Sequence, residues 1–257
     1  MPVYFISSQS IQGQTVALPG DLVHHFRDVL RCKPGETFRL VDENQTAYAV
    51  AINQVTPAGI TAEILSTDVE EAVPGFSTII AQALVKGKKM DWVIQKGTEL
   101  GMDALIPVIT DRSVPRPNTE RAPHQLRRWG KIAREAAQQC GRRDIPEIRA
   151  PLTLPGLLDS RFETMLRLFF WEKERTRSLK SVLRDRVPGK GAVILVGPEG
   201  GFSDEEMESI INDGWIPVSL GKRTLRTETA ALAALFAVQY EWGEDTSGEK
   251  LPEEGPP

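Results

Sequence analysis

Cysteine and histidine are scarce in this chain of 257 residues, which holds two cysteines and three histidines. Cys32 and Cys140 are far apart and show no CxxC or Cys/His spacing, so we expect two reduced thiols rather than a disulfide framework or a zinc site. The histidines, His24, His25 and His124, match no ligand pattern such as HExxH. We therefore expect no metal cofactor.

Long apolar runs are also missing. No stretch reaches the roughly 18 apolar residues that cross a bilayer, and the longest candidate spans residues 230–238. The first ten residues lack the basic region followed by an apolar one that marks an export signal. With 40% hydrophobic and 26% charged residues, the composition is typical of a globular protein, which we expect to be cytoplasmic and not bound to a membrane.

An overall excess of positive charge is missing as well, because the formal net charge is −4. Residues 241–257 contribute six acidic residues and one lysine, however, so residues 1–240 sum to +1. Between Arg112 and Arg149 the chain has ten basic residues against four acidic ones. This local excess is compatible with contact to a phosphate backbone and equally with a solvated helix face, and the spacing alone does not separate the two.

Residues 1–71 are predicted to form a small barrel-like β domain. Runs rich in β-branched and aromatic residues alternate there with turn signals. One helix is expected from about Asp21 to Arg31, where Leu22, Phe26, Val29 and Leu30 fall on one face. The expected strands cover residues 3–6, 37–41, 48–55 and 60–65.

After a short linker at residues 70–75, strands alternate with helices, which predicts an α/β domain with a mostly parallel sheet over residues 76–242. The Gly- and Pro-rich acidic residues 243–257 are expected to be disordered. The expected strands cover residues 79–84, 104–109, 165–171, 192–196 and 217–220. The expected helices cover residues 90–100, 126–140 and 204–212.

Several helix ends are marked by the residues around them. Ser203 followed by Glu206 predicts a capping box, so that a helix begins directly after residues 200–202. Glycines that follow a helical pattern predict helix ends. These glycines are Gly101, Gly141 and Gly214.

The most informative segment is a buried strand that runs into a glycine-rich loop, since residues 192–203 read AVILVGPEGGFS. Ligands of open α/β sheets bind at the carboxyl ends of strands, where this loop falls. Gly197, Gly200 and Gly201 would let the backbone approach a bound molecule closely. A tight strand-to-helix connection needs glycines too, so the segment alone leaves both interpretations open. It contains neither GxGxxG nor a Walker lysine, which argues against the common dinucleotide and ATP sites.

A second segment, residues 220–232, reads LGKRTLRTETAAL and again joins a strand end to a helix. Lys222, Arg223 and Arg226 stand just ahead of this helix, and Thr227 is a candidate N-cap. The helix body at residues 230–238 is apolar nearly all round, which predicts that it is buried. Basic side chains beside a buried helix cost desolvation energy unless they bind something, so the loop favours a binding role.

Together the two segments resemble the signature motifs of the RsmE family, the 16S ribosomal RNA uracil-N3 methyltransferases of the SPOUT superfamily. The motifs are GPEGGFS at residues 197–203 and LGKRTLRTETA at residues 220–230. Further similarity lies in QKGTELG at residues 95–101, EAAQQCGR at 135–142 and FRDVLR at 26–31. The resemblance covers nearly the whole chain except the tail.

The resemblance implies an N-terminal PUA-like β-barrel that binds RNA and a C-terminal SPOUT α/β domain tied in a deep trefoil knot, which no pattern alone predicts. It also implies a homodimer that holds S-adenosylmethionine, the methyl donor, in the knot. A third wall of this pocket is expected from residues 170–172. The residues matched to the cofactor pocket are Val196, Gly197, Pro198, Glu199, Gly200, Leu220, Gly221, Leu225, Arg226 and Thr227.

Methyl transfer from a sulfonium is an in-line displacement that needs alignment and loss of the proton from uracil N3, and it needs no metal. Arg226 and Glu228 are the expected catalytic residues. Arg226 would stabilise negative charge on the uracil carbonyls, while Glu228 and Glu199 are the carboxylates nearest the expected pocket. Attraction of an acid to a helix N-terminus accounts equally well for Glu228.

Contacts to the 16S rRNA, within the small ribosomal subunit, are expected from arginines near the matching segments. Residues 1–70 hold eight acids against four bases, so any contact there must come from a patch around Arg27, Arg31 and Lys33 rather than from the overall field. The expected phosphate ligands are Arg27, Arg31, Arg112, Arg116, Arg142 and Arg143.

Two other functions stay open at this point. A SPOUT methyltransferase that modifies another atom, such as a ribose 2'-hydroxyl, would share the same donor pocket. A non-catalytic ribosome-assembly protein could keep the fold and bind RNA, although the intact pair of loops argues against it.

Overall fold

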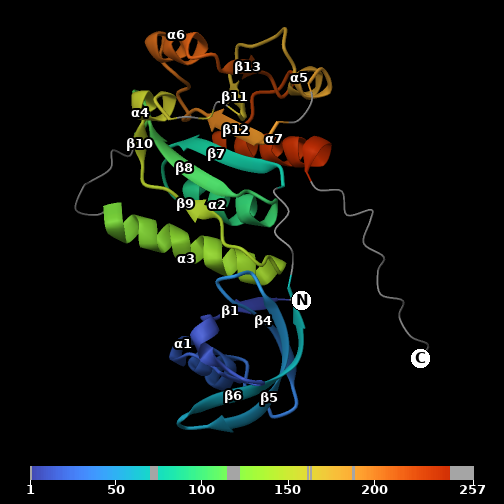
Figure 1. Ribbon diagram of the computed structural model, residues 1–257. Coiled ribbons are helices and arrows are strands. Elements are labelled where there is room, and N and C mark those ends of the chain that lie inside the picture. Colours follow the sequence, from blue (N-terminus) through green and yellow to red (C-terminus); the bar gives the residue numbers. More distant parts are fainter. Residues whose placement is uncertain are drawn as a thin grey trace. The chain divides into compact units, whose positions relative to one another are not determined.

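Helix α3 (Ala122–Cys140) is shared by two compact units of the chain in the computed structural model (Figure 1). The N-terminal unit comprises residues 1–73 and 133–145, and the C-terminal unit comprises residues 74–132 and 146–257. The structure describes residues 2–69, 75–114, 122–160, 162, 164–186 and 189–243. Apart from Gly75 and Gly243, the predicted linker and the predicted disordered tail lie outside the described residues.

A six-stranded sheet forms most of the N-terminal unit, in the order β1-β4-β5-β6-β3-β2. Strand β1 is parallel to β4, and the other described pairs are antiparallel. Inward side chains such as Phe38, Leu40 and Val50 fill its core. The four predicted strands are confirmed, whereas β2 and β3 are too short to show a pattern. The strands are β1 (Val3–Phe5), β2 (Ile11–Gln12), β3 (Thr15–Ala17), β4 (Thr37–Val41), β5 (Ala47–Thr56) and β6 (Gly59–Asp68).

The single helix predicted from Asp21 to Arg31 is instead two helical pieces, α1 (Gly20–His24) and the π-helical turn η2 (His25–Val29). The backbone N–H of Leu30 donates to the carbonyl of His25, five residues earlier, at 2.9 Å. Phe26 is buried as predicted, but Val29 and Leu30 are 60% and 46% exposed. The wider π turn shifts the angular spacing of the residues that follow it, so the predicted apolar face is wrong in its second half.

The C-terminal part of α3 packs within the N-terminal unit. Ala137 shares a small apolar cluster with Val3, Phe5 and other residues of the first strands. The guanidinium of Arg134 lies 5.2 Å from the ring centre of Phe5 and donates a 3.0 Å hydrogen bond to its carbonyl. The first strand is therefore held by a segment that comes more than a hundred residues later in the chain.

A parallel sheet forms the C-terminal unit, in the order β10-β8-β7-β12-β11-β13, with β9 paired to β8. Every strand pair described in this sheet is parallel, so the predicted α/β class is confirmed. The five predicted strands are present, and the two-residue strands β9 and β10 were not predicted. The strands are β7 (Ser77–Ala83), β8 (Ala104–Ile109), β9 (Glu147–Ile148), β10 (Leu152–Thr153), β11 (Leu166–Phe170), β12 (Gly191–Val196) and β13 (Ile216–Val218).

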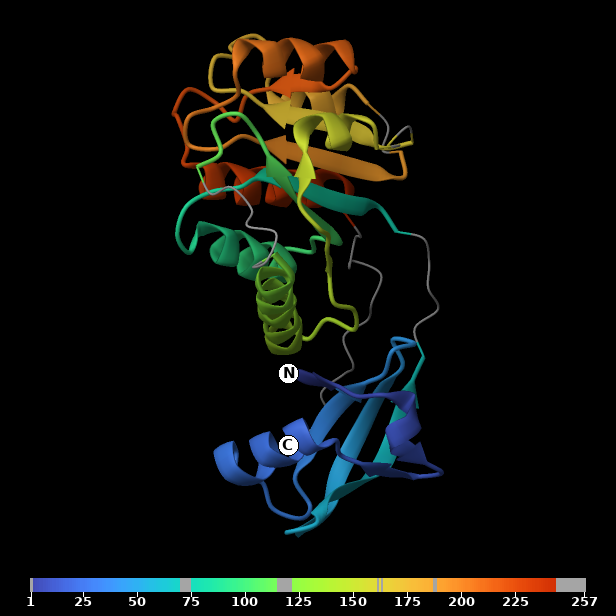
Figure 2. The ribbon, with the colours of Figure 1, turned by 90° about the vertical axis from the view of Figure 1, so that its left-hand side faces the viewer.

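Helices cover both faces of this sheet (Figures 1 and 2). Leu157 of α4 and Ile210 of α6 share one core with Val193 and Leu195 of β12. Helices α2 and α7 pack against each other on the opposite face. Strand β12 is buried along its whole length, so the loop after it starts from a rigid position. The helices are α2 (Lys89–Glu99), α4 (Leu154–Leu158), α5 (Leu179–Arg184), α6 (Asp204–Asn212) and α7 (Thr227–Trp242).

The predicted helix ends are confirmed. In α6, the Ser203 hydroxyl accepts from the backbone N–H of Glu206, and the Glu206 carboxylate accepts from that of Ser203. The three glycines that follow helices all have positive φ, a conformation that a side chain disfavours. These are Gly101 at 87°, Gly141 at 83° and Gly214 at 83°.

Helix α7 buries only one face, so the prediction of burial all round is wrong. Ala231, Leu235 and Val238 are fully buried, whereas Phe236 and Tyr240 are 56% and 80% exposed. A helix that lies on one side of a sheet has an outward face, whatever its composition. That face of α7 is aromatic, and the two rings lie 6.1 Å apart.

Candidate functional site

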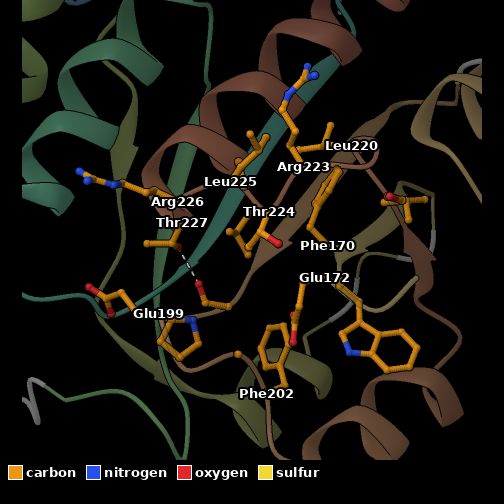
Figure 3. Close-up of a pocket in the computed structure, with 18 of the residues that line it drawn as sticks. Phe170, Glu172, Glu199, Phe202, Leu220, Arg223, Thr224, Leu225, Arg226 and Thr227 are labelled. Atoms are coloured by element: carbon orange, nitrogen blue, oxygen red, sulfur yellow. Dashed lines mark hydrogen bonds between the residues drawn. The ribbon is translucent and has the colours of Figure 1, made fainter. Parts of the chain in front are cut away.

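A cavity of about 620 Å³ lies at the carboxyl ends of β11, β12 and β13, next to the start of α7 (Figure 3). Ligands of parallel α/β sheets bind in this position. Three loops surround it, one after each of these strands. All ten residues predicted from the sequence line the cavity: Val196, Gly197, Pro198, Glu199, Gly200, Leu220, Gly221, Leu225, Arg226 and Thr227.

Gly197 and Gly201 are the constrained glycines of the loop after β12. A Cβ at Gly197 would lie 3.1 Å from the Phe202 ring, closer than side chains ordinarily pack, whereas one at Gly200 would be in ordinary contact with the Arg112 side chain at 3.4 Å. Gly201 has a φ of +67°. The Arg112 guanidinium also donates a 2.8 Å hydrogen bond to the carbonyl of Gly200, which fixes the outer side of the loop. Tight packing and ligand approach both explain these glycines, so the two interpretations are compatible.

The loop before α7 bends at Gly221, which has a φ of +116° and open space where a Cβ would be. Its backbone N–H donates to the Ser219 hydroxyl at 3.2 Å. Lys222, Arg223 and Arg226 are exposed, and the two arginines line the cavity. This loop therefore places positive charge at the rim of the cavity rather than in the core.

Thr227 joins the two loops, and its predicted role as N-cap is wrong. Arg226 occupies the cap position, and Thr227 is the first residue of α7. The Thr227 hydroxyl donates to the carbonyl of Gly197 at 2.6 Å (Figure 3). It also accepts from the Gln82 side chain at 2.9 Å. Because the hydroxyl is used in these buried bonds, it is not available to cap its own helix.

The end of β11 supplies the third wall, as predicted. Phe170, Trp171 and Glu172 all line the cavity. A Cβ at Gly201 would lie 3.4 Å from the Glu172 carboxylate, so this side chain reaches across to the loop after β12. Figure 3 shows Glu172 on the opposite side of the cavity from Glu199 and Arg226. The cavity therefore has a carboxylate at each end.

Lys89, the first residue of α2, lies at the end of the cavity that Glu199 and Arg226 form, and the sequence did not predict it. Its Nζ donates to Glu199 Oε1 at 2.6 Å and lies 3.9 Å from Glu228 Oε2. Burial raises the pKa of the Glu199 carboxyl, but the hydrogen bond and charge of Lys89, together with backbone N–H donors, outweigh it, so this pKa is lowered overall. Lys89 is 110 residues away in the chain, so no local pattern could reveal the contact.

Among the residues that the structure describes, no group of three or more His, Cys, Asp or Glu side chains is placed to hold a metal ion. No described helix is long and apolar enough to span a membrane.

Comparison with known proteins identifies the family. A model described as the RNA methyltransferase domain matches residues 74–239, and one described as the RNA methyltransferase PUA domain matches residues 18–65. The ribosomal RNA small subunit methyltransferase E of Bacillus subtilis is 32% identical over 94% of this chain and 97% of its own length. The chain belongs to the ribosomal RNA small subunit methyltransferase E family.

Solved structures agree with this family assignment. A ribosomal RNA small subunit methyltransferase E from Neisseria gonorrhoeae, bound to S-adenosylmethionine, has a TM-score of 0.83 and 33% identity, and the match covers 94% of this chain and 98% of that one. A Legionella pneumophila protein in complex with the same cofactor has a TM-score of 0.80 and 32% identity, over 93% and 96%. The RsmE family suggested by the sequence motifs is therefore confirmed.

The arginines predicted to contact RNA have different surroundings in this family member. Arg27 is half-buried and forms hydrogen bonds with its neighbour Asp28, and Arg31 has a positive φ of 56°. Arg27 belongs to the π turn and Arg31 follows it, and both are within the residues that the PUA model matches. Arg116 lies outside the described residues.

The three other arginines have protein partners. Arg142 pairs with Asp144 and is only 16% exposed, and Arg143 pairs with Asp68. Arg112 bonds to the carbonyl of Gly200, as described above. Their role as phosphate ligands stays a prediction, but any phosphate would have to compete with these partners.

Proposed function

We propose that this protein transfers a methyl group from S-adenosylmethionine to N3 of one uridine in 16S rRNA of the small ribosomal subunit. The observation that carries the proposal is the cavity between the two family motifs, residues 197–203 and 220–230, in a chain of the ribosomal RNA small subunit methyltransferase E family. The N-terminal residues 1–71 contribute RNA binding, and residues 76–242 contribute methyl transfer.

The lining of the cavity suits S-adenosylmethionine. Its volume of about 620 Å³ is within the usual range for a small-molecule site. Phe170, Leu220 and Leu225 offer apolar surface for an adenine ring, and the glycine loops offer backbone groups for its polar edges. Glu172 and Glu199 offer negative charge toward an ammonium or sulfonium group. When bound, the cofactor supplies an electrophilic methyl group.

The protein's own contribution is alignment and charge. The hydroxyl of Thr227 holds the two motif loops together, which fixes the cavity before ligands arrive. Arg226 is exposed at the rim, where its guanidinium stabilises the negative charge that develops on the uracil carbonyls as N3 loses its proton. Glu199 and Glu228 are the carboxylates at that end, and the ammonium of Lys89 faces both.

RNA contact begins in the PUA region. Arg27, Arg31 and Lys33 form a basic patch beside the π turn, in a domain that is otherwise acidic. Arg112, Arg142 and Arg143 extend the phosphate contacts when RNA displaces their present partners, and Arg116 is a further expected phosphate ligand. Because its substrate is the ribosome or its precursor, the protein works in the cytoplasm.

A homodimer and a trefoil knot complete the proposal. The exposed pair Phe236 and Tyr240 on α7 is a large apolar area for a monomer to leave in water, which supports α7 as the self-association surface. The commonest symmetric assembly is a pair related by a two-fold axis. The knot lies in the C-terminal domain, around the cofactor cavity.

The test is mass spectrometric mapping of 16S rRNA from a strain that lacks this gene. Small subunits and free 16S rRNA from that strain are each incubated with purified protein and S-adenosylmethionine. We expect one N3-methyluridine to be restored, and comparison of the two substrates identifies which is used. An Arg226→Ala variant tests the catalytic role of this arginine, since the substitution should reduce methylation by about 10²-fold or more.

The result separates the alternatives. A methyl group on a ribose 2'-hydroxyl would replace this proposal with another SPOUT activity. Binding of RNA without any methyl transfer and without affinity for S-adenosylmethionine would indicate a non-catalytic assembly protein.

A further inference from the structure

Three charged side chains from distant segments meet at one end of the cavity. Lys89 comes from the start of α2, Glu199 from the loop after β12, and Glu228 from the first turn of α7. The Lys89 ammonium is 2.6 Å from Glu199 and 3.9 Å from Glu228, so a single cation faces both carboxylates. It links the two motif loops through charge, as Thr227 does through hydrogen bonds.

The two carboxylates differ in their access to the cavity. Glu199 lines the cavity, and its side chain is 38% exposed. Glu228 is only 14% exposed and is absent from the cavity lining. Its Oε2 atom is buried and has no hydrogen-bond partner among the described residues. A substrate in the cavity can therefore reach Glu199, whereas Glu228 stands behind Lys89 as a second acceptor for its ammonium.

The net charge of this cluster allows it to accept one proton. One ammonium and two carboxylates carry a net charge of −1, so uptake of a proton by one carboxylate leaves a neutral ion pair. We propose that Lys89 is a positioning residue that joins Glu199 and Glu228 into one proton-accepting unit, in which Glu199 meets the uracil. This inference rests on the proposed methyl transfer and assigns its proton acceptor.

The proton step is balanced within this unit. The N3–H bond of uracil breaks and its proton goes to the Glu199 carboxylate. The electron pair left on N3 forms the N–CH3 bond while the S–CH3 bond of the sulfonium breaks, with its electron pair remaining on sulfur. Neutral Glu199 then attracts Lys89 less, and the ammonium pairs with Glu228. Release of the proton to water returns Lys89 to Glu199.

Lys89 favours the ionised form of Glu199 through its hydrogen bond and its charge, and so opposes protonation of this carboxylate before uracil arrives. Arg226 lines the same end of the cavity, and the backbone N–H groups of Lys86 and Glu199 also favour ionised Glu199. Without Lys89 only these groups offset the burial of Glu199, and we expect this carboxylate to hold a proton to higher pH than in the wild type.

The experiment is a pH–rate profile with the full-length protein, saturating S-adenosylmethionine and small subunits that lack the modification. In Lys89→Met, we expect the acid limb of kcat to move to higher pH by about one unit, with about 10-fold loss at pH values on the limb and recovery above it. Lys89→Arg keeps the cation, so its acid limb of kcat should lie at the same pH as that of the wild type. Adding Glu228→Gln to Lys89→Met removes the repulsion and should move the limb back down.

Two further measurements separate this role from a structural one. Carboxyl 13C NMR of the ligand-free protein should show Glu199 titrating at higher pH in Lys89→Met than in the wild type. Calorimetry should give an S-adenosylmethionine Kd within about 3-fold of wild type, and thermal unfolding should confirm folding. The matched control is Lys88→Met, because Lys88 is exposed one residue earlier and is absent from the cavity lining.

A Lys89→Met profile that coincides with the Lys88→Met profile would overturn the inference. The inference would also be overturned if adding Glu228→Gln to Lys89→Met left the acid limb of kcat at the same pH, since the two carboxylates would then act separately. Failure of the proposed function has a different signature, because the wild type itself would then form no N3-methyluridine.

Discussion

Single side chains hold the cavity together across long stretches of sequence. The residues next to Thr227 in the sequence do not reveal its contacts, yet its hydroxyl makes two buried hydrogen bonds, to Gly197 and to Gln82. Lys89 links the same two motifs through charge, to Glu199 and to Glu228. The local sequence predicts a helix start at Thr227, but only the position of β7 and β12 decides what the hydroxyl bonds to.

Replacement of Thr227 by valine should weaken both the fold and the cavity. Thr227→Val keeps the shape but leaves the Gly197 carbonyl without its buried donor, so we expect a loss of about 1–3 kcal/mol in the free energy of unfolding. Affinity for S-adenosylmethionine should fall as well, because the loop after β12 loses its tether. Urea unfolding and calorimetry measure the two effects.

The control for this prediction is Thr229→Val, two residues later on the exposed side of α7. It should change the unfolding free energy by less than about 0.5 kcal/mol. Equal stability of the two variants would show that the Thr227 bonds contribute nothing net.

At the scale of elements, the residue pattern predicted the positions of helices and strands better than it predicted which of their faces are buried. The longer strands of both sheets were predicted, because period 2 and long buried runs are strong signals, whereas β2, β3, β9 and β10 are too short to give one. The π turn η2 and the outward face of α7 were missed, because both depend on what packs against the helix. Val29, Leu30, Phe236 and Tyr240 are exposed for that reason.

The aromatic face of α7 should control self-association. The double substitution of Phe236 and Tyr240 by glutamate places charge on the proposed interface, so we expect the dimer to dissociate to a monomer of 28.5 kDa. Light scattering after size-exclusion chromatography gives the mass directly.

Ile211→Glu is the matched control, because Ile211 is a 46% exposed apolar residue on α6, on the other face of the sheet. It should leave the dimer intact. A double variant that remains dimeric would place the interface elsewhere.

At the scale of the whole molecule, charge is distributed unevenly along the chain. Residues 241–257 carry most of the negative excess, while residues 1–240 sum to +1. The RNA contacts proposed for the PUA region thus depend on local patches rather than on a general attraction.

Deletion of residues 244–257 should strengthen RNA binding at low salt. These residues contain five acidic side chains and one lysine, and their removal lowers repulsion from phosphates. We expect a gain of a few-fold in affinity that disappears at high salt, with no change in affinity for S-adenosylmethionine. Filter binding over a salt series measures it.

A tail of equal length with its five acids changed to amides is the control, and it should behave like the deletion. If the neutral tail behaves like the wild type, the effect of the deletion comes from length rather than charge.

The sequence by itself determined the class of each domain and ten of the residues that line the cavity, because strand and loop signals are local and the two family motifs are continuous. Tertiary structure alone decided what those residues do to each other. Lys89 meets Glu199 across 110 positions, and Arg143 meets Asp68 across 75. Such contacts are set by the order of strands in the sheets and by helix packing, and no local pattern encodes either.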